Sequence, residues 1–253
     1  MIKINKKLSS LNQITIPIKK DIKLFKKEFD SALNSKVYLI NIVAKYIIKK
    51  RGKNIRPILT LLTSRLCGEP SENSYRSAAM VELLHVATLI HDDVVDDATI
   101  RRGIISINKV WKNKISILMG DYILSKALIN MISIRDFDVL DCISKTAEKL
   151  SSGELLQLEK SITKTMNETI YFDMIKQKTA SLIATSCELG ALTTSKSKSD
   201  RMAMHCYGEN LGVAFQIKDD LLDLLGNEIE IGKNSGNDIK RNMITSPLIF
   251  SKS

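Results

Sequence analysis

The sequence predicts an all-α protein, built as a single-domain helical bundle. Apolar residues recur at three- and four-residue steps along most of the chain, as they do on the buried face of a helix. The 253 residues include only four prolines and eleven glycines, which are few for a β-rich or disordered chain. No linker-like stretch divides the chain. We therefore expect one domain over residues 1–253 with one large core.

The apolar pattern predicts the helices in order. Residues 1–20 are expected to form an irregular lead-in, because Pro17 opposes a continuous helix. Residues 22–48 are expected to be helical with a break near Asn34. The next helix carries Pro57 in its first turn, where proline is tolerated. Further helices are expected over residues 72–97, 107–131, 137–160, 170–192 and 201–225.

Charge and cysteine content exclude several classes of protein. The formal net charge of +10 suits a nucleic acid, an acidic membrane surface or a polyanionic substrate. No recognition motif supports the first, so we expect no nucleic-acid partner. The four cysteines are widely spaced, which indicates neither a zinc site nor disulfides. Lysines interrupt the N-terminal residues, which excludes a secretory signal, and no run approaches the length of a membrane span. We expect a soluble protein that is not integral to a membrane.

A cluster of carboxylates ends the helix expected over residues 72–97. Asp92 and Asp96 are four residues apart on one helix face, and Asp93 lies about 100° round from Asp92. Converging carboxylates suit Mg²⁺ or Mn²⁺. Substrate phosphates commonly complete the coordination of these ions. A solvated acidic helix end is the alternative explanation of this one cluster.

A second cluster repeats the same spacing. Asp219, Asp220 and Asp223 again end an apolar, helix-like segment, 127 residues after the first cluster (219 minus 92). Two such clusters suggest two walls of one metal site, with a diphosphate substrate between them. We predict all six aspartates as metal ligands.

These two motifs resemble the aspartate-rich motifs of the all-trans polyprenyl (isoprenyl) diphosphate synthases, and the resemblance runs over about residues 48–249. It implies a bundle of the isoprenoid synthase type around a central substrate cavity. It also implies a Mg²⁺-dependent trans-prenyltransferase, with more than one ion and with Mn²⁺ able to substitute. In that reaction an allylic prenyl diphosphate ionises, isopentenyl diphosphate attacks the cation, and proton loss leaves a longer chain. Family members are commonly homodimers, and we expect one here.

The resemblance also assigns roles to single residues. The predicted catalytic set is Asp92, Asp93, Asp96, Arg101, Lys178, Asp219 and Asp220. The homoallylic diphosphate is expected to contact Lys53, Arg56, His85 and Arg102. The allylic diphosphate is expected to contact Arg101, Lys178 and Lys233, and the remaining predicted substrate contacts are Thr179 and Gln216.

Some of these assignments have simpler alternatives. Lys53 and Arg56 are three residues apart, so both can point the same way, but they could be ordinary surface charges near a helix start. Asn54 stands between them where the family has a basic residue. His85 could be a core histidine. Gln157, in a G-E-L-x-Q stretch typical of the family, could line the cavity or make a polar core contact.

Product length and location are predicted from fewer features. Ala87 and Thr88 lie about one turn before Asp92 and are small, so no bulky side chain is expected to block a growing tail there. By resemblance this favours a product longer than C15. The chain stops at Ser253, where family members usually continue, so we expect the family's last helices to be absent. The expected location is a bacterial-type cytoplasm or a plastid.

Two other functions are compatible with parts of the sequence. A terpene cyclase would share the helical fold and the first acidic motif, but the intact second motif favours chain elongation. A non-catalytic or regulatory subunit of a heteromeric prenyl diphosphate synthase is the remaining alternative. Such subunits often lose an aspartate cluster, whereas this chain keeps both.

Overall fold

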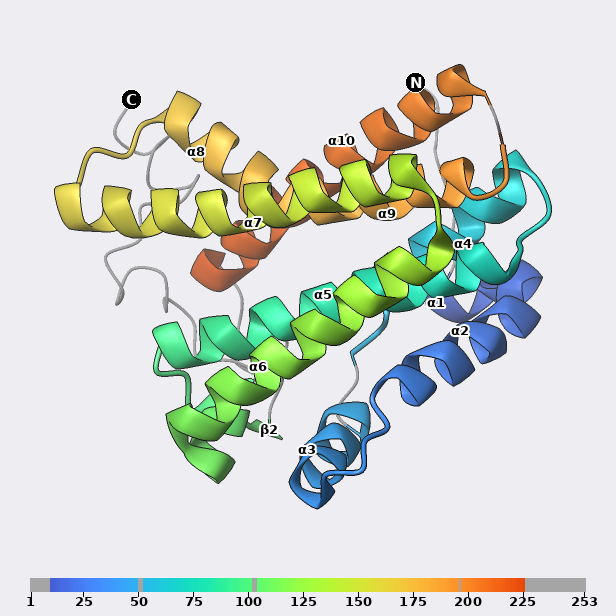
Figure 1. The fold of residues 1–253 in the computed structure, drawn as a ribbon. Helices are drawn as coiled ribbons and strands as arrows, with labels where there is room; N and C mark the ends of the chain where they lie inside the picture. The colour runs from blue at the N-terminus through green and yellow to red at the C-terminus, as the bar shows by residue number, and fades with distance from the viewer. Residues whose placement is uncertain (1–9, 50–51, 102–103, 196, 226–253) are drawn as a thin grey trace.

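The computed structural model describes residues 10–49, 52–101, 104–195 and 197–225 (Figure 1). The prediction of an all-α bundle is confirmed for this part of the chain. Its elements are α1 (Leu11–Ile14), the 3₁₀ turn η1 (Ile16–Ile18), α2 (Lys19–Ala32), α3 (Tyr38–Lys49), α4 (Ile55–Cys67), α5 (Glu72–Val95), β1 (Ile100–Arg101), β2 (Ile104–Ile105), α6 (Ile107–Ile134), α7 (Phe137–Thr163), α8 (Glu168–Ile175), the π-helical turn η2 (Lys176–Ala180), α9 (Ser181–Leu192) and α10 (Lys198–Leu225). The predicted continuation of the domain to residue 253 lies outside the described residues.

Two local features differ from the sequence prediction. The expected helix over residues 170–192 is interrupted by η2, a π-helical turn that joins α8 to α9. Such turns occur often at functional sites, and this one carries Lys178 and Thr179. The second difference is the two-residue antiparallel hairpin β1–β2, in which Ile100 pairs with Ile105. The periodicity of apolar residues contains no signal for either feature.

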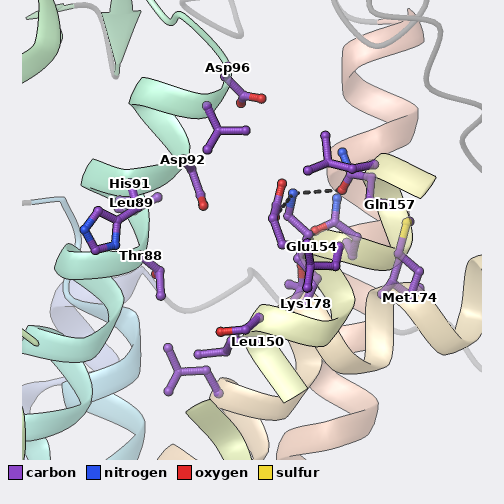
Figure 2. A pocket seen from close by; sticks show the side chains of 18 of the residues that line it. Thr88, Leu89, His91, Asp92, Asp96, Leu150, Glu154, Gln157, Met174 and Lys178 are labelled. Atoms are coloured by element: carbon purple, nitrogen blue, oxygen red, sulfur yellow. Dashed lines mark hydrogen bonds and ion pairs between the residues drawn. The ribbon is translucent and has the colours of Figure 1, made fainter. Parts of the chain in front are cut away.

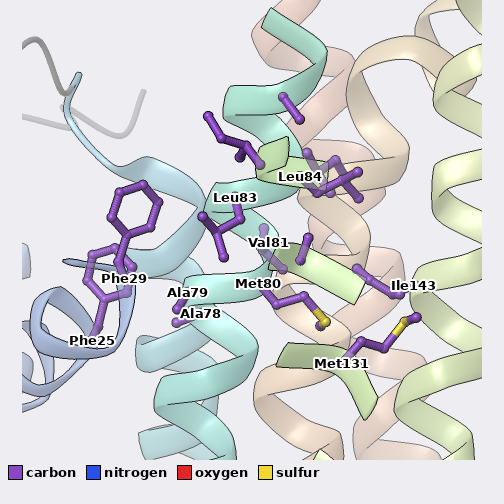
Figure 3. Packing of buried hydrophobic residues seen from close by; sticks show 14 of the residues in the cluster. Phe25, Phe29, Ala78, Ala79, Met80, Val81, Leu83, Leu84, Met131 and Ile143 are labelled. Atoms are coloured by element: carbon purple, nitrogen blue, oxygen red, sulfur yellow. The ribbon is translucent and has the colours of Figure 1, made fainter. Parts of the chain in front are cut away.

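Helix α5 lies at the centre of the bundle, between α2 and α4 on one side and α6 on another, while α9 packs on α4, α7 and α10 (Figure 1). Its buried residues surround the helix, which is why the sequence shows no polar face there. Phe25 and Phe29 of α2 are buried beside Leu83 of α5. Met80 of α5 points towards Met131 of α6 (Figure 3). This packing holds the end of α5, with the first acidic cluster, in a fixed place.

Helix α6 is long and apolar enough to span a membrane by length and composition alone. This differs from the prediction that no run approaches that length. Its most apolar window has a mean hydropathy of 1.4 and is 33% buried. Ile123, Ala127 and Met131 of this helix lie in the core, and a core helix of a soluble protein passes the same test. The finding is therefore weak support for a span.

Helix α10 approaches its neighbours closely at two glycines one turn apart. A Cβ atom at Gly208 would lie 2.6 Å from the Cα of Ala184, and one at Gly212 would lie 2.5 Å from the Cα of Ala180. Both neighbours are backbone atoms, which cannot rotate aside. The close approach brings the end of α10, with Asp219, towards η2.

We expect Gly212→Ala to lower the free energy of unfolding by about 1–3 kcal/mol, the usual cost of overpacking a tight contact. Denaturant unfolding of wild type and variant measures the change. Helix propensity alone would act in the opposite direction, because alanine is favoured over glycine in a helix by about 1 kcal/mol. A more stable variant would therefore contradict the close contact between α10 and η2.

A half-buried ion cluster outside the central cavity joins α9 to α10. Glu188 of α9 lies 2.5 Å from Nε of Arg201 and 2.7 Å from Nδ1 of His205, both on α10. Burial alone would raise the pKa of Glu188, but the hydrogen bonds from His205 and Arg201 outweigh it and lower the pKa to about 2. The same contact raises the pKa of His205.

The lowered pKa of Glu188 predicts a contribution to stability that is present above about pH 4.5 and is lost as the pH falls towards 2, because the unfolded carboxyl takes up its proton first. We expect Glu188→Gln to remove this part of the acid dependence in unfolding experiments between these pH values. Glu148→Gln, at an exposed position of α7, is the control and should leave the dependence unchanged. An identical acid dependence in wild type and Glu188→Gln would contradict the assignment.

Candidate active site

The two acidic clusters meet at one cavity of about 640 Å³. Asp92 and Asp96 line it from α5, and Asp219 and Asp220 line it from α10. Figure 2 shows Asp92 and Asp96 facing Lys178, Glu154 and Gln157 across the opening. Residues that are 127 positions apart in sequence (219 minus 92) thus form two walls of one space, as their repeated spacing predicts.

The other two predicted ligands do not line this cavity. Asp93 is only 5% exposed, and its carbonyl oxygen accepts a hydrogen bond of 3.0 Å from Nδ2 of Asn108 at the start of α6. Asp223 lies one turn beyond the lining residues of α10 and is half-buried. The rotation of about 100° between consecutive helix residues separates Asp93 from Asp92. The predicted roles of Asp93 and Asp223 as metal ligands stay predictions.

Arg56 and His85, both predicted to contact the homoallylic diphosphate, come together at the cavity. A guanidinium nitrogen of Arg56 lies 2.9 Å from Nε2 of His85, and both side chains line the cavity. Lys53 instead lines a separate pocket of about 250 Å³, so the two residues face different spaces here, although their spacing allows both to point the same way. The cause is the left-handed backbone of Asn54 (φ 51°), which redirects the chain before α4 begins.

Lys178 is held by two neighbours on α7. Its Nζ lies 2.5 Å from Oε2 of Glu154 and donates a hydrogen bond of 2.8 Å to Oε1 of Gln157 (Figure 2). Gln157 also lines the cavity, so of its two alternatives, cavity lining or a polar core contact, the structure favours the first. Glu154 and Lys160 also line the cavity and were not predicted, although the i, i+3 spacing of Glu154 and Gln157 in G-E-L-x-Q could have indicated a shared face.

His91, next to Asp92, is anchored to α6. Its Nε2 lies 3.2 Å from Oδ1 of Asp121, and a Cβ atom at Gly120 would lie 2.3 Å from the same nitrogen. The G-D pair of α6 therefore has a local purpose: the glycine leaves room for the imidazole and the aspartate binds it. These contacts give Asp121 a structural role in holding the imidazole of His91.

The side chains of three predicted basic residues lie outside the part of the chain that the structure describes. Arg101 belongs to β1 by its backbone, and its side chain lies outside the described residues. Arg102 and Lys233 also lie outside them. Their predicted contacts with diphosphate stay predictions.

Apolar side chains also line the cavity. Leu150, Met174, Ile175 and Leu182 are among them, and Thr88 faces the cavity from α5 (Figure 2). Ala87 is 1% exposed and packs in the core, and it is not among the residues that line the cavity, so its place beside a growing chain stays a prediction. Its neighbour Thr88 is the small residue that faces the cavity.

The acidic residues fit a hard divalent cation by their chemistry, because Mg²⁺ prefers carboxylate oxygens. Within the described part of the chain, however, no three histidine, cysteine or acidic side chains are grouped so that they could hold an ion by themselves. Mg²⁺ usually keeps waters and takes substrate phosphates as further ligands. Carboxylates on two walls with space between them suit that kind of shared coordination.

An all-α bundle with two acidic walls, basic side chains and apolar side chains around one cavity defines a prenyl-transferring enzyme of the isoprenoid synthase type. Comparison with known proteins agrees. A family model described as "Polyprenyl synthetase" matches residues 37–253. The chain belongs to the polyprenyl synthetase family, and the predicted family, fold class and function as a chain-elongating trans-prenyltransferase are confirmed.

Individual relatives give the degree of similarity. The chain is 35% identical to an all-trans-nonaprenyl-diphosphate synthase (geranyl-diphosphate specific) of Rhodobacter capsulatus, over 93% of this chain and 73% of that protein. It is 34% identical to a heptaprenyl diphosphate synthase component 2 of Bacillus subtilis, over 91% of this chain and 66% of that protein. The crystal structure of a polyprenyl synthase from Caulobacter crescentus, complexed with calcium and isoprenyl diphosphate, superposes with a TM-score of 0.92 at 32% identity, over 98% of this chain and 75% of that one.

Proposed function

We propose that this chain condenses isopentenyl diphosphate with an allylic prenyl diphosphate, at the cavity between α5 and α10, to give products longer than C15. The observation that carries the proposal is the meeting of Asp92 and Asp96 with Asp219 and Asp220 at one cavity that apolar side chains also line. Charged diphosphates fit beside the acidic and basic side chains once cations are bound, and an isoprenoid tail fits beside the apolar ones.

Metal ions would be held by the six aspartates, with Asp92, Asp96, Asp219 and Asp220 facing the cavity. Bound Mg²⁺, or Mn²⁺ in its place, supplies positive charge that stabilises the departing pyrophosphate. Lys178 supplies a further fixed charge from η2, and the proposal extends this role to Arg101 and Lys233. Glu154 and Gln157 hold the Lys178 ammonium in place before substrate binds.

The homoallylic diphosphate is assigned to Arg56 and His85, with Arg102 and Lys53 as further predicted contacts. A planar guanidinium can bind two phosphate oxygens at once, and the contact of 2.9 Å between Arg56 and His85 orients it. The separate position of Lys53 means that, in the described conformation, Arg56 and His85 are the contacts that face the cavity.

The apolar side chains that line the cavity are assigned to the growing chain. Leu150, Met174 and Leu182 exclude water, which would otherwise quench the allylic cation to an alcohol. Of Ala87 and Thr88, only Thr88 lines the cavity. The relatives named as nonaprenyl and heptaprenyl synthases support a long product.

We further propose a homodimer that forms through the outer face of α6. Large apolar side chains are exposed along this 28-residue helix, and an exposed apolar stripe of this extent is costly without a partner. They are Ile117, Leu118, Leu128, Ile129 and Ile132. The location in a bacterial-type cytoplasm or a plastid stays a prediction.

Incubation of the purified chain with Mg²⁺, labelled isopentenyl diphosphate and geranyl diphosphate, a C10 primer, tests the proposed reaction, and we expect extractable products longer than C15. The relative named as component 2 of a synthase favours one alternative, a subunit that needs a different partner chain. No turnover by the chain alone, but turnover when it is co-expressed with a second synthase subunit, would support that alternative. Products no longer than C15 would contradict the proposed chain length.

A further inference from the structure

Asp220 is the most deeply buried carboxylate of the second acidic cluster. It is 4% exposed, whereas Asp219 beside it is exposed. Both of its oxygens accept hydrogen bonds: Oδ1 from Nε2 of Gln216 at 2.7 Å and Oδ2 from the hydroxyl of Tyr171 at 2.6 Å. Burying a carboxylate is costly unless donors replace water, so these two donors stabilise its charged form in a single orientation.

Tyr171 is itself fixed by packing on all sides. Its side chain is fully buried in α8 and clusters with Met174 and Ile175. Its ring meets that of Phe172 edge-on, with centroids 5.5 Å apart. The side chain of Asn167 caps the start of α8 by accepting a hydrogen bond from the backbone of Ile170. The hydroxyl therefore has little freedom to move away from Asp220.

A second hydrogen bond ties the same segment to α10. Helix α8 continues directly into η2, where the hydroxyl of Thr179 donates a hydrogen bond of 2.7 Å to Oε1 of Gln216. Gln216 in turn donates to Asp220. Tyr171 and Thr179 thus hold the acidic cluster at two points, and the segment that does so also carries Lys178.

We infer that Tyr171 is a positioning residue for the diphosphate site: its hydroxyl fixes the Asp220 carboxylate so that the carboxylate faces the cavity. Tyr171 does not line the cavity and acts only through Asp220. Each carboxylate oxygen has further lone pairs, so the two hydrogen bonds leave acceptor sites for a cation. The inference rests on the proposed function, because it assumes that Asp220 serves a Mg²⁺–diphosphate complex.

Tyr171→Phe tests the inference, because it removes the hydroxyl and keeps the buried ring. Binding of inorganic pyrophosphate to the full-length chain is measured by calorimetry with and without Mg²⁺, together with thermal unfolding of the free protein. We expect Mg²⁺-dependent pyrophosphate binding to weaken by about 10-fold or more, as for loss of one hydrogen bond to a charged group. In steady-state elongation, we expect a higher Mg²⁺ requirement.

Tyr75→Phe is a closely matched control. Tyr75 also donates a hydrogen bond from its hydroxyl to a buried aspartate, Asp21, at 3.1 Å, and it does not line the cavity. It should lower thermal stability comparably without weakening Mg²⁺-dependent binding. Equal pyrophosphate affinities in wild type and Tyr171→Phe, or equal losses in both variants, would overturn the positioning role alone. Absence of Mg²⁺-dependent pyrophosphate binding by the wild type would overturn the proposed diphosphate site as well.

Discussion

Asp92→Ala is expected to lower kcat for chain elongation by about 10²–10³-fold, the usual effect of removing one group that stabilises charge in a transition state. Asp92 faces the cavity from α5, opposite the wall that carries Lys178. Its loss removes one predicted ligand of the ions that stabilise pyrophosphate as it leaves. Initial rates with labelled isopentenyl diphosphate at saturating Mg²⁺ measure the effect.

Asp141→Ala is the control for Asp92→Ala. Asp141 is exposed on α7 and pairs with Lys145 at 2.8 Å, so its removal changes the charge of the chain by the same amount outside the cavity. We expect it to retain wild-type activity. If Asp92→Ala also retained activity within a few-fold of wild type, the first acidic cluster would not serve the reaction.

Thr88→Phe is expected to shorten the product while elongation continues. Thr88 faces the cavity from α5, and Leu150 lies towards the same end of the cavity in Figure 2. An aromatic ring in place of the small side chain would fill the space that the growing tail must enter. Chain-length analysis of the extracted products by mass spectrometry measures the change.

Thr88→Val is the matched control, because it keeps the shape of threonine and should keep the product distribution. Ala87→Phe is expected to behave differently from Thr88→Phe, since Ala87 is buried in the core and a ring there would destabilise the fold. An unchanged product distribution in Thr88→Phe would show that the isoprenoid tail takes another path.

The helices and the two acidic walls could be predicted because both depend on local spacing. Apolar residues at three- and four-residue steps predict a helix whatever surrounds it. Asp219 and Asp223 repeat the four-residue spacing of Asp92 and Asp96, which indicates two related clusters. Two such clusters suggest two walls of one metal site, and the resemblance to a known family adds the expectation of a central substrate cavity.

Other parts of the site depend on backbone geometry and packing that the sequence does not display. The left-handed conformation of Asn54 separates Lys53 from Arg56, although three-residue spacing would place both on one helix face. The π-helical turn at Lys178 has no periodic signal. In the sequence, Tyr171 cannot be told apart from an ordinary core aromatic residue. Its hydrogen bond to Asp220 is what connects it to the site.

The central claim is that the two acidic clusters form one diphosphate site. Crystals grown with Mn²⁺ and an unreactive thiolo analogue of an allylic diphosphate, measured at the manganese absorption edge, test it most directly. We predict anomalous peaks in the cavity that contact Asp92 or Asp96 on one wall and Asp219 or Asp220 on the other, with the diphosphate between them. Manganese bound at only one cluster, with the diphosphate outside the cavity, would contradict the claim.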